Sequence, residues 1–242
     1  MTVRTTERPD PEREDSRFAF FSKWRLSAPR GPEDPPGSGG IQAALDAIAA
    51  VWEREPWPSP GLLGYHLCTG EDGETLLHYS QWADEDAYET YVRDHRQTRV
   101  DEIDAAVPGI ERLGIGRFQL YRSGTLDSDV RTPGCIVIVD IEFEGPDPDR
   151  QRAWVDTVFA ALQDDPQLPR GGISSHFHLG TDGTRVLNYA EWESAQAHIA
   201  ALEAPGRGIG SPTELWKRVQ EYPGLKGSTV QRFRPAFSLV PG

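Results

Sequence analysis

Cysteine is scarce in this chain: Cys68 and Cys135 are the only two among 242 residues, and they lie far apart without a CxxC spacing. A disulfide framework and a zinc knuckle are thereby excluded, so we expect two buried thiols and no metal site. The sequence also lacks any apolar run near the roughly 18 residues of a membrane-spanning helix, and its N-terminus lacks an apolar signal core. These absences predict a soluble, cytoplasmic protein.

Positive charge is scarce as well, because the net charge is −13, the pI is about 4.9 and no basic cluster occurs. Such a surface repels phosphate backbones and anionic lipid, so we expect neither nucleic acid nor a membrane as a partner. Apolar residues make up 37% and aromatic residues 10%, which is enough for a packed core. Arginine far outnumbers lysine, which is typical of a GC-rich bacterial genome.

What the chain does contain is an internal repeat. Residues 61–92 align without gaps to residues 171–202, and nine of the 32 positions are identical, where about two would match by chance. The identical pairs are Gly61/Gly171, His66/His176, Gly70/Gly180, Asp72/Asp182, Gly73/Gly183, Leu77/Leu187, Tyr79/Tyr189, Trp82/Trp192 and Ala87/Ala197. A repeat of this length indicates two folded copies rather than a solenoid.

Both copies show the same order of expected elements. Apolar, β-rich runs at 18–26 and 135–143 open the copies, and an amphipathic helix follows each run. A hairpin with an Asp-Gly turn comes next. A second helix then begins at an N-cap residue, Asp84 or Ser194, and a final strand closes each copy. The order βαββαβ is that of a ferredoxin-like unit.

The expected fold class is therefore α+β, with two tandem ferredoxin-like units that bury their bare sheet faces against each other in a pseudo-symmetric α+β barrel. Residues 27–40, rich in Gly and Pro, form either a mobile lid or an insertion. The predicted parts are a disordered tail (1–16), a first domain (17–123), a linker (124–133) and a second domain (134–242).

The most informative repeat is the joint between the third strand and the second helix, "LHYSQWADEDAY" and "LNYAEWESAQAH". Because side chains of a strand alternate between faces, His78 and Trp82 share one face. The Trp leads directly into the helix, so we expect this face under the helices, where Tyr88 can point back at it. The same reasoning predicts a second pocket, lined by Asn188, Trp192 and His198.

With these residues the chain resembles the antibiotic biosynthesis monooxygenase family of dimeric α+β barrels, over about residues 17–237. Members carry an Asn-x3-Trp-x5-Tyr pattern at this joint and form homodimeric barrels or tandem fusions. The resemblance implies an intramolecular dimeric α+β barrel and an antibiotic-biosynthesis monooxygenase of polyketide metabolism. Such an enzyme oxidises a small aromatic phenol or anthrone with O2 as co-substrate and needs no cofactor, neither metal nor flavin.

Six residues would be catalytic by this resemblance: Asn188, Trp192 and His198 in the second copy, and His78, Trp82 and Tyr88 in the first. His198 stands in place of the family's Tyr, and His78 stands in place of its Asn, so neither copy keeps the whole pattern. Asn188 or a protonated His198 would stabilise an enolate oxygen, and a neutral His78 would accept the proton. The indoles of Trp82 and Trp192 would stack on a flat substrate.

Two other functions stay open at this point. One is a non-oxidative polyketide cyclase or isomerase that uses His78 or His198 as acid or base. The other is a binding protein of the same fold that no longer catalyses. The sequence also leaves open which copy is active and whether two fused chains pair as a homodimer.

Haem and metal are less compatible with the spacing. Haem-degrading relatives place a His ligand about ten residues after the Trp, where this chain has Val92 and Leu202. His176 and His178 could share a strand face, but no third ligand has a matching spacing. The hairpin geometry places His66 and His176 on the face opposite the Trp, so we expect interface residues rather than ligands there.

Overall fold

The computed structural model of the chain divides into two compact units, Met1–Arg117 with Phe233–Gly242, and Phe118–Arg232. The residues that the structure describes are 1–26, 38–125, 131–164, 170–204 and 209–242. Most of the predicted loop 27–40 and half of the predicted linker 124–133 therefore lie outside the described residues.

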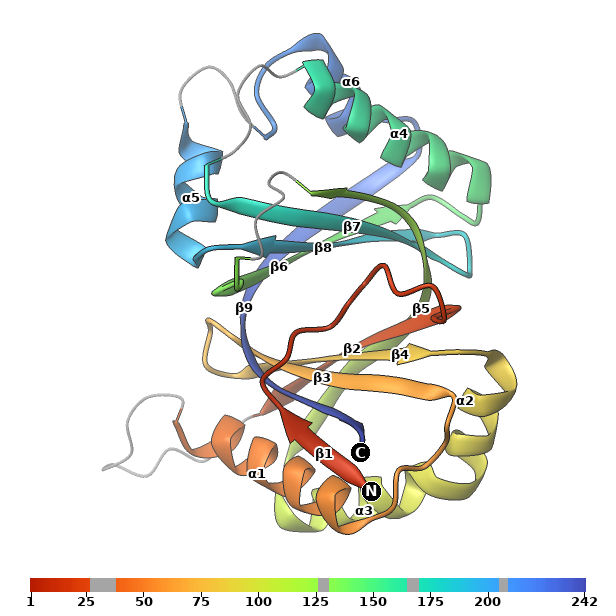
Figure 1. Cartoon of the computed structure of the whole chain (residues 1–242). Coiled ribbons are helices and arrows are strands. Elements are labelled where there is room, and N and C mark those ends of the chain that lie inside the picture. Colours follow the sequence, from red (N-terminus) through yellow and green to blue (C-terminus); the bar gives the residue numbers. More distant parts are fainter. Residues whose placement is uncertain (27–37, 126–130, 165–169, 205–208) are drawn as a thin grey trace. The chain divides into compact units, whose positions relative to one another are not determined.

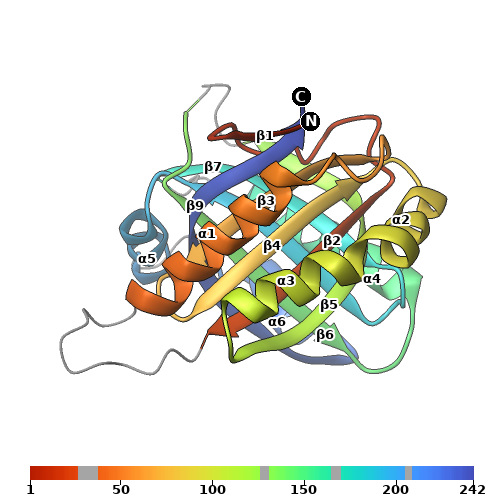
Figure 2. The same ribbon diagram turned by 90° about the horizontal axis from the view of Figure 1, so that it is seen from below.

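The first unit has a sheet with the strand order β1-β9-β3-β4-β2-β5, in which β5, β2, β4 and β3 reproduce the ferredoxin-like order. Its helices cover one face of that sheet (Figure 2), and the core between them includes Ile48, Trp52, Leu67 and Trp82. Its elements are β1 (Thr2–Thr5), β2 (Phe18–Leu26), α1 (Ser38–Arg54), β3 (Leu62–Gly70), β4 (Thr75–Trp82), α2 (Glu85–Tyr91), the π-helical turn η1 (Val92–Arg96), α3 (Gln97–Ala106) and the start of β5 (Ile110–Thr125).

The second unit repeats this arrangement, with β9, β6, β8 and β7 in the ferredoxin-like order and β5 beside β7. Three helices lie on one face of its sheet (Figure 1), and Trp154, Val158 and Phe177 lie in the core beneath them. Its elements are β6 (Cys135–Phe143), α4 (Pro148–Asp164), β7 (Gly172–Gly180), β8 (Arg185–Trp192), α5 (Ala195–Glu203), α6 (Glu214–Gln220) and the start of β9 (Leu225–Pro241). The predicted fold class, α+β with two tandem ferredoxin-like units, is confirmed.

The closing strands β5 and β9 are longer than the sequence suggests. From Phe118 onward β5 pairs with β7, and from Phe233 onward β9 pairs with β3. Each closing strand thus begins in its own unit and continues into the sheet of the other. The compact units therefore change at Arg117 and Arg232, within strands, rather than at the linker that the sequence predicts.

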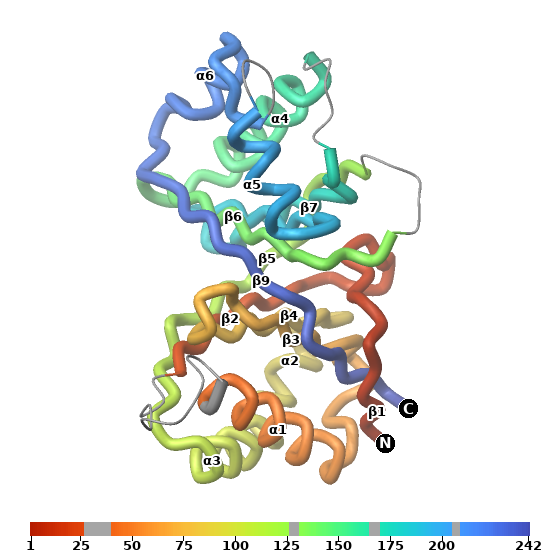
Figure 3. Tube along the Cα trace, turned by 90° about the vertical axis from the view of Figure 1, so that its left-hand side faces the viewer, coloured from red at the N-terminus to blue at the C-terminus, as the bar shows by residue number. Residues whose placement is uncertain are grey.

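The prediction that residues 1–16 form a disordered tail is wrong for the first residues of that segment. Thr2–Thr5 form β1 antiparallel to β9, with Thr2 opposite Pro241, so the two chain ends lie together (Figure 3). Arg4 lies 4.2 Å over the ring of Phe237. An edge strand held by backbone hydrogen bonds needs no apolar alternation, so a polar segment such as this gives no strand signal.

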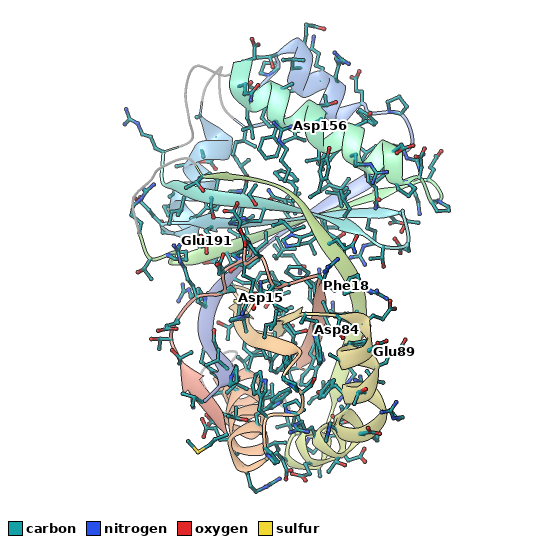
Figure 4. The ribbon with its side chains drawn as sticks, turned by 45° about the vertical axis from the view of Figure 1, so that its right-hand side comes forward. Asp15, Phe18, Asp84, Glu89, Asp156 and Glu191 are labelled. Atoms are coloured by element: carbon teal, nitrogen blue, oxygen red, sulfur yellow. The ribbon has the colours of Figure 1, made fainter. Side chains whose placement is uncertain are left out.

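Both helix starts at the repeated joint are confirmed. The Asp84 carboxylate accepts a hydrogen bond from the Ala87 backbone N–H at 2.7 Å, and the Ser194 hydroxyl accepts one from Ala197 at 3.1 Å. Figure 4 shows Asp84 where β4 gives way to α2. These caps fix the turn that brings α2 and α5 back over their sheets.

Much of the repeated identity is explained by the fold rather than by chemistry. A Cβ atom at Gly61 would lie 2.3 Å from the Ala87 Cβ, and one at Gly171 would lie 2.6 Å from the Ala197 Cβ. Gly73 has a φ of 72° in its hairpin, a conformation that favours glycine. The Gly-Ala pairs that both copies share thus let α2 approach the start of β3 closely, and α5 the start of β7.

Substitution of Gly61 by alanine should therefore decrease the free energy of unfolding by about 1–3 kcal/mol, the usual cost of overpacking. Urea denaturation of the purified chain measures this. Gly227→Ala is the matched control, because a Cβ atom there meets no atom within 4 Å. Equal stabilities of the two variants would contradict the close approach at Ala87.

Candidate active site

The strand parity predicted at the joint is confirmed in both units. His66 lies opposite Tyr79, and Leu67 lies opposite His78, so His66 and His78 are on different faces of the sheet. The second unit has the same register, with Phe177 opposite Asn188. The face that carries His78 and Asn188 is the face covered by helices.

The first unit has a small pocket between its sheet and its helices, with a volume of about 100 Å³. Three predicted site residues, His78, Trp82 and Tyr88, all line it. The Trp82 and Tyr88 rings meet edge to face with centroids 5.2 Å apart, and the Trp82 Nε1–H donates to the Ser80 hydroxyl at 3.0 Å. Trp24, Trp52 and Tyr65 also line the pocket, so its own aromatic side chains fill most of the space.

His78 is buried in this pocket between two aromatic rings. Its ring centroid lies 4.0 Å from that of Trp24, and the Tyr65 hydroxyl is hydrogen-bonded to its Nδ1 atom. Burial lowers the pKa of His78 to about 3, and the charge of Arg112 lowers it further. Burial also raises the pKa of the Tyr65 hydroxyl, so Tyr65 keeps its proton and can donate it to Nδ1 in the tautomer protonated at Nε2.

This geometry corrects the role that the sequence suggests for His78. With Nδ1 occupied by the Tyr65 proton, the neutral imidazole carries its own proton on Nε2. The pKa of about 3 makes His78 a weak base at neutral pH. A general-base role for His78 is therefore not supported by its surroundings.

The second unit has a larger cavity in the corresponding place, with a volume of about 340 Å³. Its lining includes all three predicted residues of this copy, Asn188, Trp192 and His198. Most of the remaining lining is apolar, and among the described residues His198 is the one titratable side chain in it. Ligand sites for small molecules usually have about 300–1,000 Å³ and such apolar walls.

The difference in volume follows from the side chains at equivalent positions. Helices α1 and α4 and the two hairpins correspond at an offset of 110 residues, and the opening strands correspond through their pairing with Trp82 and Trp192. At these positions the first unit has large aromatic residues where the second has smaller ones: Trp24 against Ile141, Trp52 against Leu162, Tyr65 against Ser175, and Tyr91 against Ala201. The second unit is therefore the one with space for a polycyclic ligand.

His198 has a fixed orientation in this cavity. Its ring meets the Trp192 indole edge to face at 4.8 Å, and the Arg232 Nε–H donates to its Nδ1 atom at 3.0 Å. Burial lowers the pKa of His198 to about 4, and the charge of Arg232 adds to this. The expectation of a protonated His198 is wrong, because the ring is neutral near pH 7. Its proton is on Nε2, which can still donate to a ligand oxygen.

Two further polar atoms of the cavity lining, Asn188 Oδ1 and Trp216 Nε1, are buried without a hydrogen-bond partner among the described residues. Buried polar atoms are nearly always hydrogen-bonded, so water or a ligand in the cavity would complete this pair. Trp216 lies on α6, which begins at the N-cap Thr213. Sequence reasoning missed Trp216 and Arg232, although the segment "TELWKRVQ" carries a capping signal that could have predicted α6.

No group of three or more His, Cys, Asp or Glu residues that could hold a metal ion occurs in the described part of the chain. Cys68 and Cys135 are free thiols and are buried, as expected. None of the helices among the described residues is long and apolar enough to span a bilayer.

A segment that includes the joint between β4 and α2 matches a known protein family. Residues 38–102, from α1 into α3, match the sequence profile of the family "Antibiotic biosynthesis monooxygenase". This segment, about a quarter of the chain, is therefore similar to antibiotic biosynthesis monooxygenases. Over 63 residues the chain is also 36% identical to tetracenomycin-F1 monooxygenase of Streptomyces glaucescens, a match that spans 26% of this chain and 55% of that protein.

Solved structures share the fold of this chain over nearly its whole length. An anthrone oxidase-like protein has a TM-score of 0.63 at 17% identity, with 98% of this chain and 95% of that chain covered. A protein from Fusobacterium nucleatum described as a candidate monooxygenase has a TM-score of 0.54 at 7% identity, with 92% and 94% covered. At these identities the likeness concerns the fold alone.

The family match and the larger cavity fall in different units. The profile matches the first unit, in which aromatic side chains leave about 100 Å³, whereas the cavity of about 340 Å³ is in the second unit. The unit that is more similar to the family in sequence is thus the one with less room for a ligand.

Proposed function

We propose that the chain is a cofactor-independent monooxygenase that oxidises a phenolic or anthrone-type aromatic compound with O2 in the cavity of its second unit. The observation that carries this proposal is the mainly apolar cavity of about 340 Å³, whose polar lining groups include Asn188, His198 and Trp216. The match of residues 38–102 to the family and the identity to tetracenomycin-F1 monooxygenase support the reaction class.

The apolar walls would hold a flat polycyclic substrate, with the Trp192 indole against its rings. The Asn188 carboxamide offers an acceptor to a hydroxyl group and donors to an oxyanion. The His198 Nε2–H and the Trp216 Nε1–H are two further donors. Hydrogen bonds to an oxyanion in an apolar cavity favour ionisation of the substrate, and each pKa unit corresponds to about 1.4 kcal/mol.

The ionised substrate is the electron donor in this reaction. One electron passes from the carbanion-enolate to O2, and the resulting radical and superoxide combine to a C–O bond. The protonated hydroperoxide loses water as the second hydrogen leaves the same carbon, so a CH2 group and O2 give a C=O group and H2O. The protein needs to bind the substrate, stabilise its anion and shield it, and the cavity lining offers groups for these tasks, while the proton released on ionisation passes to water.

Acid–base catalysis of a cyclisation or isomerisation receives less support from the cavity. The one titratable residue of its described lining, His198, has a pKa of about 4, and the His198 Nδ1 atom already accepts a hydrogen bond from Arg232. A residue in this state neither gives up nor accepts a proton readily near pH 7.

Dioxygen consumption with an anthrone substrate, measured with an oxygen electrode in the presence of a metal chelator, tests the proposal. Substitution of Asn188 by leucine should decrease kcat by about 10²-fold, the usual effect of removing an oxyanion donor. Gln196→Ala on α5 is the control, because that side chain is exposed. Product formation without O2 consumption would identify a cyclase or isomerase instead, and binding without any product would identify a binding protein.

A further inference from the structure

The small pocket of the first unit contains a buried charge without a counter-ion. Arg99 is 4% exposed and lines this pocket. Its Nη2 donates to the Pro56 carbonyl oxygen at 2.8 Å and its Nη1 donates to that of His95 at 3.3 Å, while its Nε is buried without a partner. Within the described part of the chain Arg99 has no carboxylate partner. Buried guanidinium groups are usually paired with an anion, so this one is an exception.

Glu55 is the carboxylate whose charge acts on Arg99, but the ion pair that it forms is with Arg54, at 3.7 Å. Burial dominates, and it lowers the pKa of Arg99 from its usual value. The Trp52 ring, whose centroid lies 5.0 Å from the Arg99 Cζ atom, adds a cation–π contact, but no carboxylate among the described residues pairs with the guanidinium.

A second unpartnered donor lines the same pocket. His78 is 3% exposed, and its Nε2 atom is buried without a hydrogen-bond partner. In the tautomer in which Tyr65 donates to Nδ1, the Nε2 atom carries the proton and is a donor. In that tautomer His78 lacks an acceptor among the described residues.

A third positive group comes from the π-helical turn η1. Arg96 is half-buried, lines the pocket, and has no carboxylate partner among the described residues. Its charge lowers the pKa of the hydroxyls of Tyr65, Tyr88 and Tyr91, which shows that it faces these groups. The extra residue in such a turn often orients a side chain toward a functional site.

We infer that this pocket is a binding site for a small monoanion of carboxylate or hydrogencarbonate size, held by Arg99, Arg96 and the Nε2–H of His78. Its volume of about 100 Å³ corresponds to roughly three water molecules. This is below the roughly 150 Å³ of a cavity known to accept benzene, so an aromatic ring is excluded. The walls of Trp24, Trp52 and Trp82 exclude water and strengthen each charged hydrogen bond.

The other titratable and charged groups near the pocket do not supply the negative charge that Arg96 and Arg99 lack. Arg112 on β5 lies 5.1 Å over the Trp24 ring and is paired with Asp104 at 2.7 Å. Tyr65 and Tyr91 keep their protons, because burial raises the pKa of both hydroxyls. The pocket lining as a whole contains Arg96 and Arg99 but no Asp or Glu.

Titration of the full chain with sodium formate, acetate and nitrate tests this inference, with sodium gluconate holding the ionic strength constant. Tryptophan fluorescence should change saturably with at least one of the three anions, because Trp24, Trp52 and Trp82 line the pocket. Arg99→Met should raise the dissociation constant at least tenfold, and Arg96→Met should raise it several-fold. Arg93→Gln, an exposed arginine of the same turn paired with Asp94, should leave it unchanged.

A saturable response to none of the three anions would overturn the inference, as would equal dissociation constants of Arg96→Met and Arg93→Gln. If circular dichroism shows that Arg99→Met is unfolded, the Arg96→Met variant decides the question alone. The titration uses neither the aromatic substrate nor O2. Its result is therefore independent of whether the second unit oxidises an anthrone.

Discussion

Lowering the pH from 7 to 5 should decrease the free energy of unfolding by about 6 kcal/mol through three buried histidines alone, which is a large part of the 5–15 kcal/mol that a domain usually has. These are His66, His78 and His178, whose pKa values burial lowers from 6.5 to about 3. Burial also lowers the pKa of His198, to about 4, which adds a loss in the same direction. At a pH between the folded and the unfolded pKa, the unfolded chain binds a proton at each histidine and the folded chain does not. Stability is therefore present above about pH 6.5 and is lost as the pH falls, by about 2 kcal/mol per histidine at pH 5.

Urea denaturation at pH 7, 6 and 5 measures this loss. The variant His66→Gln removes one of the three groups, and its stability should decrease by about 2 kcal/mol less over the same pH range. His66 is a suitable choice because its Nδ1 lies 2.6 Å from the Ser238 hydroxyl, a partner that an amide can also bond. Equal stability of the unmodified chain at pH 5 and pH 7 would mean that these histidines are protonated in the folded state.

The order of helices and strands in each unit was predictable from the sequence, but the boundaries of the units were not. Repeat identity predicts the two copies, the caps at Asp84 and Ser194 predict the second helices, and strand parity predicts which face carries His78 and Asn188. These signals are local, because each depends on residues within one turn or one strand. The exchange of β5 and β9 between units depends on pairing between distant segments, and strand β1 depends on backbone hydrogen bonds alone, so neither has a local signal.

The candidate site was predictable in position but not in chemistry. The joint places His78, Trp82 and Tyr88, or Asn188, Trp192 and His198, at one pocket in each unit. The protonation of His78 and His198 depends on burial and on Tyr65 and Arg232, which come from other strands. Those partners have no sequence spacing that identifies them, so the sequence does not indicate how far burial lowers the pKa of His78 and of His198. Their catalytic roles remain a prediction for the experiments above.

The volume of each cavity is a further property that the motif at the joint does not predict. It depends on the summed volumes of side chains from α1 or α4 and from three strands, and one Trp in place of a Leu changes it considerably. The family pattern at the joint is nearly the same in the two units, whereas the residues around it differ in size. Space rather than motif therefore distinguishes the two units, and this distinction can be tested by exchanging the residues.

Filling the second-unit cavity with the side chains of the first unit should decrease kcat/KM for an anthrone at least 100-fold, or about 2.7 kcal/mol in transition-state free energy. The variant is the double substitution Leu162→Trp and Ser175→Tyr, which introduces the residues found at Trp52 and Tyr65. The first unit folds with these bulky residues at the same positions of helix and strand, so the second unit has a precedent for accommodating them. Loss of activity would then reflect loss of space rather than loss of a functional group.

Leu162→Met is the matched control, because it keeps the volume and the apolar character of the wall and should retain activity within a few-fold. Binding of an anthraquinone, followed by quenching of tryptophan fluorescence, separates substrate affinity from turnover in both variants. Full turnover by the filled variant would place the reaction outside the second-unit cavity. The polar groups Asn188, His198 and Trp216 are unchanged in both variants, and Ser175→Ala, which removes the Ser175 hydroxyl without filling the cavity, separates the loss of this polar group from the loss of volume.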